Sequence, residues 1–318
     1  LLEYKELTKL YSTYISVLPE LIHPVTGRLH ARFNPMGART GRFSSGGNGI
    51  NLQNQPKSAR KLFVAPPGYV ILGGDFSQQE YRALAYFSRD PILIENYKQG
   101  RDLYSSIAAE VFNKPIEECG DGSIYRKQTK VILLAVAYGG GANMLKDAIG
   151  VSKQEAQAFL DSFFERFPVV AQWVEENRRF VKKHGFVWMD KQQRKRRLPH
   201  GKDRNHPQYY SSVFTQSTNA IIQGSAAIQT KVTMNKLQEL CERKTAEGRG
   251  EWRLLCVVHD EALLLVPDTI TRQDVKDFEN VMLYSYTFGD VPNKTDVELY
   301  KRWGEGISVE EWFKEENN

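Results

Sequence analysis

The sequence predicts an α+β protein in which a helical block interrupts a sheet domain. Short β-type apolar runs lie on both sides of the block, at residues 69–72 and 253–266, and most apolar residues between them recur at helical spacing. Strands, then helices, then strands again is the element order of an α+β chain with a helical insertion. At roughly 100–200 residues per domain, the length allows two or three compact units.

The composition is ordinary for a globular protein, with 41% hydrophobic and 25% charged residues, which excludes a collagen-like, mucin-like or wholly disordered chain. The longest strongly apolar run, residues 131–138, is far shorter than the roughly 20 residues of a membrane span. Three cysteines without a CxxC pair argue against a disulfide framework or zinc site and favour a reducing cytosol. The start has neither a signal pattern nor an initiator Met, so we expect a piece of a longer cytoplasmic protein.

The N-terminal part should contain one helix, a long loop and one strand. Helical spacing of apolar residues predicts a helix over residues 1–21. Residues 23–56 are rich in Gly, Asn, Ser and Arg and should form a loop with short strands. The turn signal Pro66-Pro67-Gly68 precedes the strand at residues 69–72, which ends at Gly73-Gly74-Asp75.

The middle of the chain should be mostly helical. Residues 78–112 have helical spacing with interruptions at Asp90-Pro91 and Gly100, and three glycines stop a further helix at residues 126–138. A capping-box pattern at Ser152 opens the next helix, which Pro168 ends or kinks before another one.

The final part should return to a sheet. Five of the seven residues from Lys191 to Arg197 are basic, which indicates either contact with a nucleic-acid backbone or a solvated charged face. Helical spacing resumes over residues 215–240. Two apolar runs within residues 253–266, joined at His259-Asp260-Glu261, predict a β-hairpin.

Two aspartates at the ends of predicted strands are candidate metal ligands. Asp75 and Asp260 would converge at one sheet edge if their strands are neighbours. Two charges about 4 Å apart repel by roughly 1–4 kcal/mol, and a cation relieves this repulsion. Oxygen-only ligands select Mg²⁺ or Mn²⁺, and a metal pair held by carboxylates serves phosphoryl transfer. The alternative is that Asp75 and Asp260 are solvated acids at a turn or strand end and bind no metal.

Four residues at spacings of four form a candidate phosphate-binding stripe. Arg126, Lys130, Leu134 and Tyr138 lie on one slightly slanted line along the predicted helix, over about 18 Å. Arg binds phosphate oxygens with its planar fork, and Lys adds a point charge. The alternative is an amphipathic helix with Leu134 and Tyr138 in the core, although Val131, Ile132 and Leu133 already supply an apolar face.

Five segments in this order resemble motifs of family A DNA polymerases, the family of bacterial DNA polymerase I and its phage relatives. They are Thr40-Gly41-Arg42-Phe43-Ser44-Ser45 followed by Asn51-Leu52-Gln53-Asn54; Asp75-Phe76-Ser77-Gln78-Gln79-Glu80-Tyr81-Arg82; Arg126 to Gly139; Asn219-x3-Gln223-Gly224; and Val258-His259-Asp260-Glu261. The resemblance implies a palm with an antiparallel sheet and a largely helical fingers insertion, with most of the thumb absent. Residues 1–80 would be the thumb-exit helix and first part of the palm, 81–214 the fingers, and 215–318 the second part of the palm.

The resemblance also implies a role for each matching residue. Asp75, Asp260 and the backbone carbonyl of Phe76 would bind two Mg²⁺ ions, for which Mn²⁺ can substitute, and Glu261 would assist. The nucleotide-binding residues would be Arg126, Lys130 (also catalytic), Leu134, Tyr138, Gln78 and Glu80, the last as a steric gate against a 2′-hydroxyl. Arg42, Asn51, Gln53, Asn219, Gln223 and His259 would contact DNA. The implied partners are primer–template DNA and dNTPs, together with either a missing N-terminal thumb and exonuclease portion or accessory replication proteins. The implied location is the cytoplasm of a bacterial or phage-infected cell, and no membrane is expected as a partner.

Several residues depart from the family pattern. Leu134 replaces a Phe or Tyr, and Thr215 replaces an Arg four residues before Asn219. Tyr104, in Asp102-Leu103-Tyr104, replaces a His, and Gln193 replaces a Gly in the basic run. The expected activity is template-directed DNA synthesis. The alternatives are a single-subunit RNA polymerase, which a carboxylate gate at Glu80 argues against, and a nucleic-acid-binding module without activity.

Overall fold

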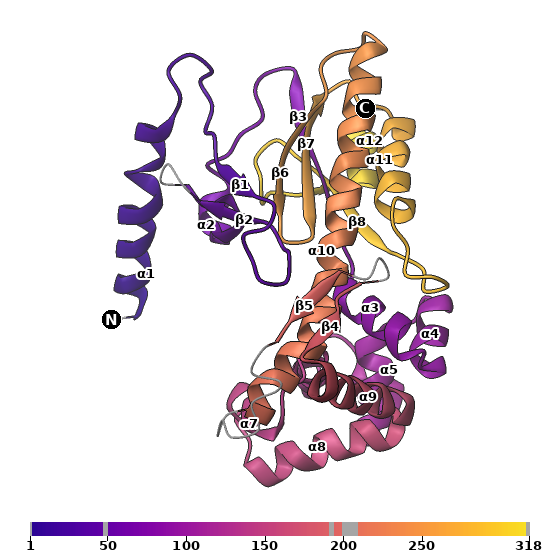
Figure 1. Cartoon of the computed structure of the whole chain (residues 1–318). Coiled ribbons are helices and arrows are strands. Elements are labelled where there is room, and N and C mark those ends of the chain that lie inside the picture. The colour runs from indigo at the N-terminus through magenta and orange to yellow at the C-terminus, as the bar shows by residue number, and fades with distance from the viewer. Residues whose placement is uncertain (1, 47–49, 191–193, 199–208, 316–318) are drawn as a thin grey trace. The chain divides into compact units, whose positions relative to one another are not determined.

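The computed structural model describes residues 2–46, 50–190, 194–198 and 209–315, and the chain divides into two compact units (Figure 1). The sheet unit comprises Leu1–Ser77, Gln229–Tyr286 and Lys294–Asn318, and the helical unit comprises Gln78–Ile228 and Thr287–Asn293. Helix α10 (Tyr209–Ala246) contributes to both. The mixed α+β fold class is confirmed, whereas the palm and fingers boundaries at residues 80 and 214 stay predictions. None of the helices that the structure describes is long and apolar enough to cross a bilayer.

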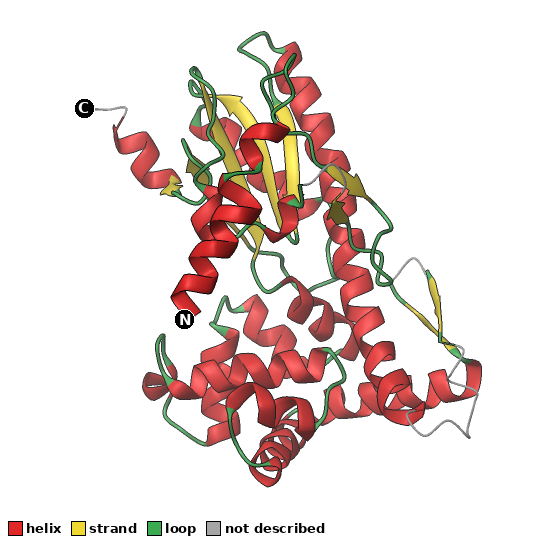
Figure 2. Cartoon of the chain, turned by 90° about the vertical axis from the view of Figure 1, so that its left-hand side faces the viewer, coloured by secondary structure: helices red, strands yellow, loops and turns green. Residues whose placement is uncertain are grey.

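A five-stranded antiparallel sheet forms the centre of the sheet unit (Figure 2). Its order is β6 (Arg253–Val258), β7 (Glu261–Pro267), β3 (Tyr69–Phe76), β8 (Thr295–Tyr300) and β9 (Ile307–Ser308). The predicted strand and the predicted hairpin are thus β3 and β6–β7, and they are neighbours. Strands β8 and β9, with helices α11 (Arg272–Tyr284) and α12 (Val309–Glu315), were not predicted.

Successive residues of the central strand β3 face opposite sides of the sheet. Val70 and Leu72 belong to the main core, which also contains apolar residues of α10 and α11 such as Leu237 and Phe278. Ile71 belongs to a smaller cluster with Trp303 on the other side. The alternation therefore places Asp75 on the side of Ile71, away from the core beneath α11.

The N-terminal segment of the sheet unit is more broken than the sequence predicts. Helix α1 covers Leu2–Leu10, a π-helical turn follows at Tyr11–Ile15, and a 3₁₀ turn ends the segment at Leu18–Leu21. Pro19 lies in this last turn and has no N–H to continue an α-helix. The expected loop with short strands is confirmed by the ribbon β1 (Arg32–Asn34) and β2 (Ser44–Gly46), followed by the 3₁₀ turn at Leu52–Asn54 and helix α2 (Lys57–Arg60).

The helical unit contains the predicted helices and one more. They are α3 (Gln79–Ser88), α4 (Pro91–Lys98), α5 (Leu103–Phe112), α6 (Ile124–Ala137), α7 (Ala142–Ile149), α8 (Lys153–Arg166) and α9 (Pro168–His184), with a 3₁₀ turn at Ile116–Cys119. Ser152 forms the predicted capping box, and Pro168 begins a new helix. Helix α7 was not predicted. A two-stranded ribbon of β4 (Phe186–Trp188) and β5 (Lys195–Arg197) follows α9.

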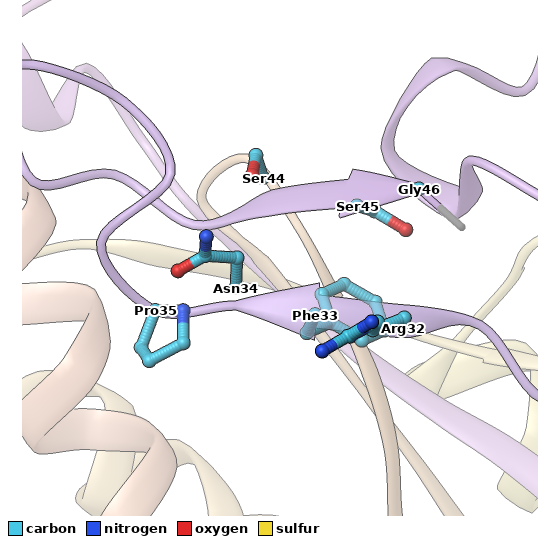
Figure 3. Close-up of a pocket in the computed structure, with 7 residues that line it drawn as sticks. All are labelled: Arg32, Phe33, Asn34, Pro35, Ser44, Ser45 and Gly46. Carbon is cyan, nitrogen blue, oxygen red and sulfur yellow. The ribbon is translucent and has the colours of Figure 1, made fainter.

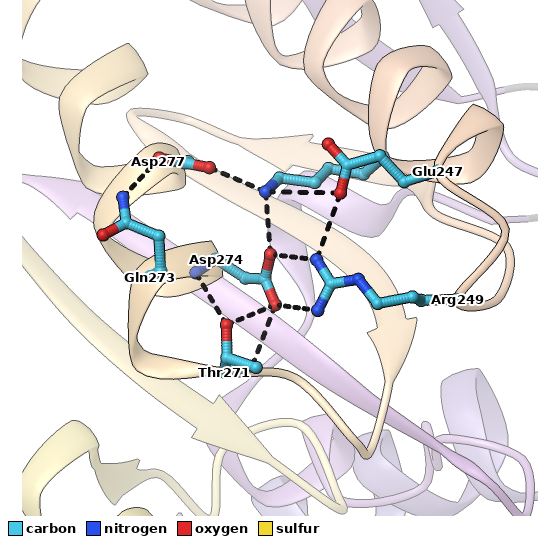
Figure 4. A network of polar contacts seen from close by, with 7 residues as sticks. Glu247, Arg249, Thr271, Gln273, Asp274 and Asp277 are labelled. Carbon is cyan, nitrogen blue, oxygen red and sulfur yellow. Dashed lines mark hydrogen bonds and ion pairs between the residues drawn. The ribbon is translucent and has the colours of Figure 1, made fainter.

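A buried ionic network fixes the end of α10 to the start of α11 (Figure 4). The Nζ of Lys244 lies 2.7 Å from both Asp274 Oδ1 and Asp277 Oδ2, and Arg249 donates to Asp274 at 2.8 Å. Burial alone would raise the pKa of Asp274, but hydrogen bonds from Arg249, Lys244 and Thr271 hold this pKa well below its usual range. The buried charges of Lys244 and Asp274 are therefore compensated inside the protein, Lys244 by two aspartates and Asp274 by Lys244 and Arg249.

Two glycines just before Asp75 let neighbouring rings lie against the strand. A Cβ at Gly74 would come within 2.6 Å of the buried Phe278 ring, and one at Gly73 within 2.7 Å of the Tyr300 ring. We therefore predict that Gly74→Ala lowers the free energy of unfolding by about 1–3 kcal/mol, the usual cost of overpacking a core. Urea denaturation measures this change. The matched control is Gly46→Ala on β2, where a Cβ would meet nothing within 4 Å; equal effects of the two substitutions would contradict the prediction.

Candidate active site

Three carboxylates form one row across the central strands of the sheet. Asp75 on β3 pairs directly with Glu261 on β7 and with Asp296 on β8. Residues directly opposite each other in an antiparallel sheet point to the same face, with Cβ atoms about 4.5–5.5 Å apart. The strand register thus gathers three acids on the face of the sheet opposite α11.

A fourth carboxylate enters from the turn between β6 and β7. Asp260 follows His259, whose φ of 59° lies in the left-handed region and turns the chain sharply between the two strands. The N–H of Phe76 donates to the carbonyl oxygen of Asp260 at 3.4 Å, which fixes the turn against the end of β3. The structure therefore brings Asp75, Phe76, His259, Asp260 and Glu261 together at one sheet edge.

These acids line an open cavity of about 330 Å³ within the sheet unit. Its walls are Arg60, Asp75, Val258, His259, Asp260, Glu261, Asp296, Glu298 and Tyr300. Arg60 is the one Lys or Arg among these described lining residues. Its guanidinium lies 3.5 Å from Glu261 and 4.6 Å from the centre of the Trp303 ring. One arginine faces five carboxylates, so the cavity is strongly negative.

The crowding of acids raises their pKa values. Part of Asp75 is open to solvent, but desolvation of its carboxyl, followed by the charges of Asp260, Glu261 and Asp296, raises its pKa to about 7. Burial also raises the pKa of Asp260, against the opposing charge of Arg42. Burial raises the pKa of Glu261 as well, with Arg60 opposing. The cavity therefore has an excess of negative charge that a bound cation would neutralise.

The donor atoms suit a hard divalent cation. The side chains that meet Asp75 offer carboxylate oxygens, which Mg²⁺ and Mn²⁺ prefer, and the cavity has no cysteine in its described lining. In the part of the chain that the structure describes, no group of three or more His, Cys, Asp or Glu side chains is already arranged as a complete metal site. The chemistry of the carboxylates fits Mg²⁺, with water or a ligand completing its coordination.

The predicted cationic stripe lies on α6 of the helical unit. Ile132, Leu133 and Val136 are buried, whereas Lys130 is exposed and Leu134 is half-buried. Tyr138 is the C-cap residue of α6 and is half-buried too. The core thus takes the other side of the helix, which argues against the alternative that Leu134 and Tyr138 are core residues.

Helix α5 supports the two cations of the stripe. Its N-cap residue Asp102 accepts hydrogen bonds from Arg126 at 2.8 and 3.3 Å, and Asp121 lies 2.9 Å from the same guanidinium. The ring of Tyr104 lies under both Arg126 and Lys130, 5.3 and 5.1 Å from their charged groups. Tyr104, noted above only as a departure from the family pattern, therefore positions both cations.

Gln78 and Glu80 lie at the start of α3 in the same unit. Gln78 has a φ of 56°, and its side-chain oxygen accepts a hydrogen bond from Tyr97 at 3.1 Å. Glu80 is half-buried in the first turn of the helix. Burial of Tyr81 and Tyr104 is the main reason that their pKa values are raised, and the negative charge of Glu80 raises both pKa values further. Glu80 therefore lies near Tyr104, whose ring faces Arg126 and Lys130, and near Tyr81, whose ring contacts that of Tyr104.

Three predicted DNA-contacting residues lie around the β1–β2 ribbon of the sheet unit. A shallow cavity follows this ribbon, lined by Arg32 to Pro35 and by Ser44 to Gly46 (Figure 3). Arg42 leads into β2. Asn51 accepts a hydrogen bond from the N–H of Gln53, and the side chain of Gln53 is buried, so Gln53 is less accessible than the sequence suggested.

Two more predicted DNA contacts lie on α10 in the helical unit, whereas the last, His259, lies in the β6–β7 turn of the sheet unit. Asn219 and Gln223 are half-buried and one turn apart, and among the described residues nothing donates a hydrogen bond to the side-chain oxygen of Asn219. Thr215 donates its hydroxyl to the carbonyl of Gly139 at 3.1 Å, so this position ties α10 to the end of α6. In the basic run, residues 191–193, including Gln193, lie outside the described residues. Arg194 precedes β5, and Lys195 to Arg197 form this strand.

Sequence reasoning missed the acids on β8 and the partner of Glu261. Asp296 and Glu298 alternate with Val297 in the segment Thr295-Asp296-Val297-Glu298-Leu299-Tyr300, and this period of two is a strand signal. Arg60 lies in a short helix without a recognisable motif, so only the fold reveals its contact with Glu261.

Comparisons with known proteins identify the family of this chain. The family model for DNA polymerase family A matches residues 1–305. The thermostable DNA polymerase I of Thermus aquaticus is 34% identical over 309 residues, covering 95% of this chain and 36% of the relative. DNA polymerase I of Chloroflexus aurantiacus is 33% identical over 311 residues, covering 96% and 32%.

One solved structure is similar to this chain in both fold and sequence. It is the POL domain of Pol1 from M. smegmatis in complex with DNA primer-template and dNTP, with a TM-score of 0.84 and 31% identity, covering 95% of this chain and 52% of that one. The present chain spans about a third of the length of the curated relatives that it matches. With the family model matching nearly the whole chain, the protein belongs to DNA polymerase family A.

Proposed function

We propose that this chain is the catalytic part of a template-directed DNA polymerase, which joins dNTPs to the 3′-hydroxyl of a primer. The observation that carries the proposal is the row of Glu261, Asp75 and Asp296 with Asp260 beside it, since such an excess of carboxylates favours metal-assisted phosphoryl transfer. Membership of family A and the DNA-bound structural neighbour support it.

The acids of the sheet unit would hold two Mg²⁺ ions. Asp75 and Asp260 are the proposed ligands, together with the backbone carbonyl of Phe76, and Mn²⁺ can substitute. When bound, the ions would activate the primer hydroxyl and neutralise charge on the phosphates and the leaving pyrophosphate. Glu261 would assist at the edge of the site, where Arg60 holds its carboxylate in place.

Residues of the helical unit would bind the incoming nucleotide. Arg126 and Lys130 would hold the triphosphate, and the ring of Tyr104 lies against the charged groups of both side chains. Lys130 would also stabilise charge on the phosphates during transfer. Leu134 would face the sugar and base, and Tyr138 would guard the templating position. Glu80 would exclude a 2′-hydroxyl, with Gln78 beside it.

The remaining predicted residues would contact primer–template DNA. Arg42, Asn51, Gln53 and His259 belong to the sheet unit, and Asn219 and Gln223 belong to the helical unit. Amide and imidazole groups suit the hydrogen-bond acceptors of the minor groove, which all base pairs share and which therefore report pair shape without reading sequence. Arg42 would add a phosphate contact.

Primer extension tests the proposed function directly. Asp75→Asn keeps the shape of the side chain and removes its charge. We expect it to reduce dNTP addition by more than about a hundredfold, which exceeds the usual effect of changing a residue that only orients a metal ligand. Binding to primer–template should stay intact. Asp268→Asn, at an exposed aspartate after β7, is the control. Comparable extension by the Asp75 variant and the parent would contradict the metal-binding role.

Thermal unfolding provides a second test, independent of activity. The raised pKa of Asp75 means that the folded metal-free protein binds this proton more tightly than the unfolded chain does, so its contribution to stability falls as the pH rises from about 4 to 7. Asp75→Asn should therefore raise the Tm in EDTA more at pH 8 than at pH 5. Mg²⁺ should raise the Tm of the parent at pH 8 but have little effect on the variant. If Asp75→Asn changed the Tm in EDTA by the same amount at pH 5 and pH 8, titration of Asp75 would be excluded as the cause.

The proposed steric gate can be tested by its size. Glu80→Ala should lower the preference for dNTPs over rNTPs by about tenfold or more, because the 2′-hydroxyl would gain room. Glu80→Gln keeps the volume and should retain most of the preference. Single-nucleotide incorporation efficiencies measure both variants, with Glu165→Ala on an exposed position of α8 as the control. An unchanged ratio in the alanine variant would assign Glu80 to another role.

A further inference from the structure

The ribbon of β4 and β5 has one buried face and one open face. Its register pairs Phe186 with Arg197, Val187 with Arg196 and Trp188 with Lys195. Val187 is only 1% exposed and packs in the core cluster of the helical unit. Because side chains alternate along a strand, Phe186, Trp188, Lys195 and Arg197 share the opposite face. We call these four residues the aromatic–basic face.

The aromatic–basic face is open to solvent. Trp188 is 40% exposed, and Lys195 and Arg197 are exposed as well. The rings of Phe186 and Trp188 are 5.1 Å apart and nearly perpendicular, and the ammonium of Lys195 lies 4.1 and 5.0 Å from their centres. Core packing does not require a large ring on this side of the ribbon, since Val187 already fills the core.

The charge next to this face is also positive. The last turn of α9 carries Lys182, Lys183 and His184, and Gly185 then turns the chain directly into β4. The ring of His184 lies 5.9 Å from that of Phe186. A ligand of this face should therefore combine a flat, stackable group with negative charge.

We propose that the aromatic–basic face binds the unpaired template strand of a primer–template, with a base stacked on Trp188 and phosphates at Lys195 and Arg197. A single strand presents base faces beside a charged backbone, whereas a duplex hides its base faces inside the stack. An acidic peptide would match the charge but not the rings. The inference rests on the proposed function, because a polymerase substrate always carries such an unpaired strand.

The experiment compares primer–templates with overhangs of 2 and 12 thymidines, using fluorescence anisotropy and no dNTP. The longer overhang should increase the affinity of the parent, and Trp188→Leu should remove that gain, a loss on the order of tenfold for one stacked base. Trp188→Phe keeps an aromatic ring and should restore most of the gain. Tyr284→Leu changes an exposed ring of the sheet unit and should have no effect.

Two further arms separate stacking from charge. A 12-nucleotide overhang of abasic sites keeps the phosphates and should bind the parent as weakly as the thymidine overhang binds Trp188→Leu. Lys195→Gln should reduce the slope of log affinity against log salt by about one, as expected for one lost phosphate contact. Equal binding of the parent and Trp188→Leu to the long overhang, or full affinity for the abasic strand, would overturn the proposal.

The outcomes distinguish this inference from the proposed function. Overhang-dependent binding through Trp188 without primer extension would refute polymerase activity and leave the binding surface established. Extension by the parent with no effect of Trp188→Leu on overhang binding would refute only the binding surface.

Discussion

Repulsion among carboxylates in one cross-strand row is the constraint around which the sheet unit is built. The pairing of β3 with both β7 and β8 places Asp75 between Glu261 and Asp296, and no rearrangement of side chains can move the three acids to different faces without changing the register. The sheet has to be held by other forces, chiefly its apolar core under α10 and α11. The stability of that core allows a cluster of like charges to persist at its edge.

The nearby features are consequences of the same constraint. Glycines at positions 73 and 74 let Tyr300 and Phe278 pack against the strand just before Asp75, so β3 is held tightly on both faces where the charges meet. The left-handed turn at His259 brings Asp260 to the same edge, and Arg60 offsets part of the charge of Glu261. The backbone that carries these acids is therefore held in place before any divalent ion binds, so that mainly the carboxylate side chains would have to be ordered around the ion.

The sequence predicted those elements in which one local signal dominates. The apolar runs of β3 and of the β6–β7 hairpin, and the capping box at Ser152, identified their elements because burial or hydrogen bonding acts over a few residues. Strand β8 was missed because its polar and apolar residues alternate, which a search for continuous apolar runs overlooks, and Asp296 was missed with it. The contacts of Tyr104 with Arg126 and Lys130 join two helices, so spacing within either helix could not reveal them.

The order of the strands also determines when the acidic row can form during synthesis. The central strand β3 is synthesised before its neighbours β7 and β8, which follow about 190 and 220 residues later. The hydrogen bond from the Thr295 hydroxyl to the carbonyl oxygen of Asp75, for example, joins residues that are 220 positions apart. Until then, in a chain that is still being synthesised, the β3 segment with Val70 and Leu72 has neither of its two neighbouring strands. Contacts so distant in sequence close slowly. Most of the helical unit, by contrast, is one continuous stretch between these strands and can fold first, so the row of carboxylates assembles after it.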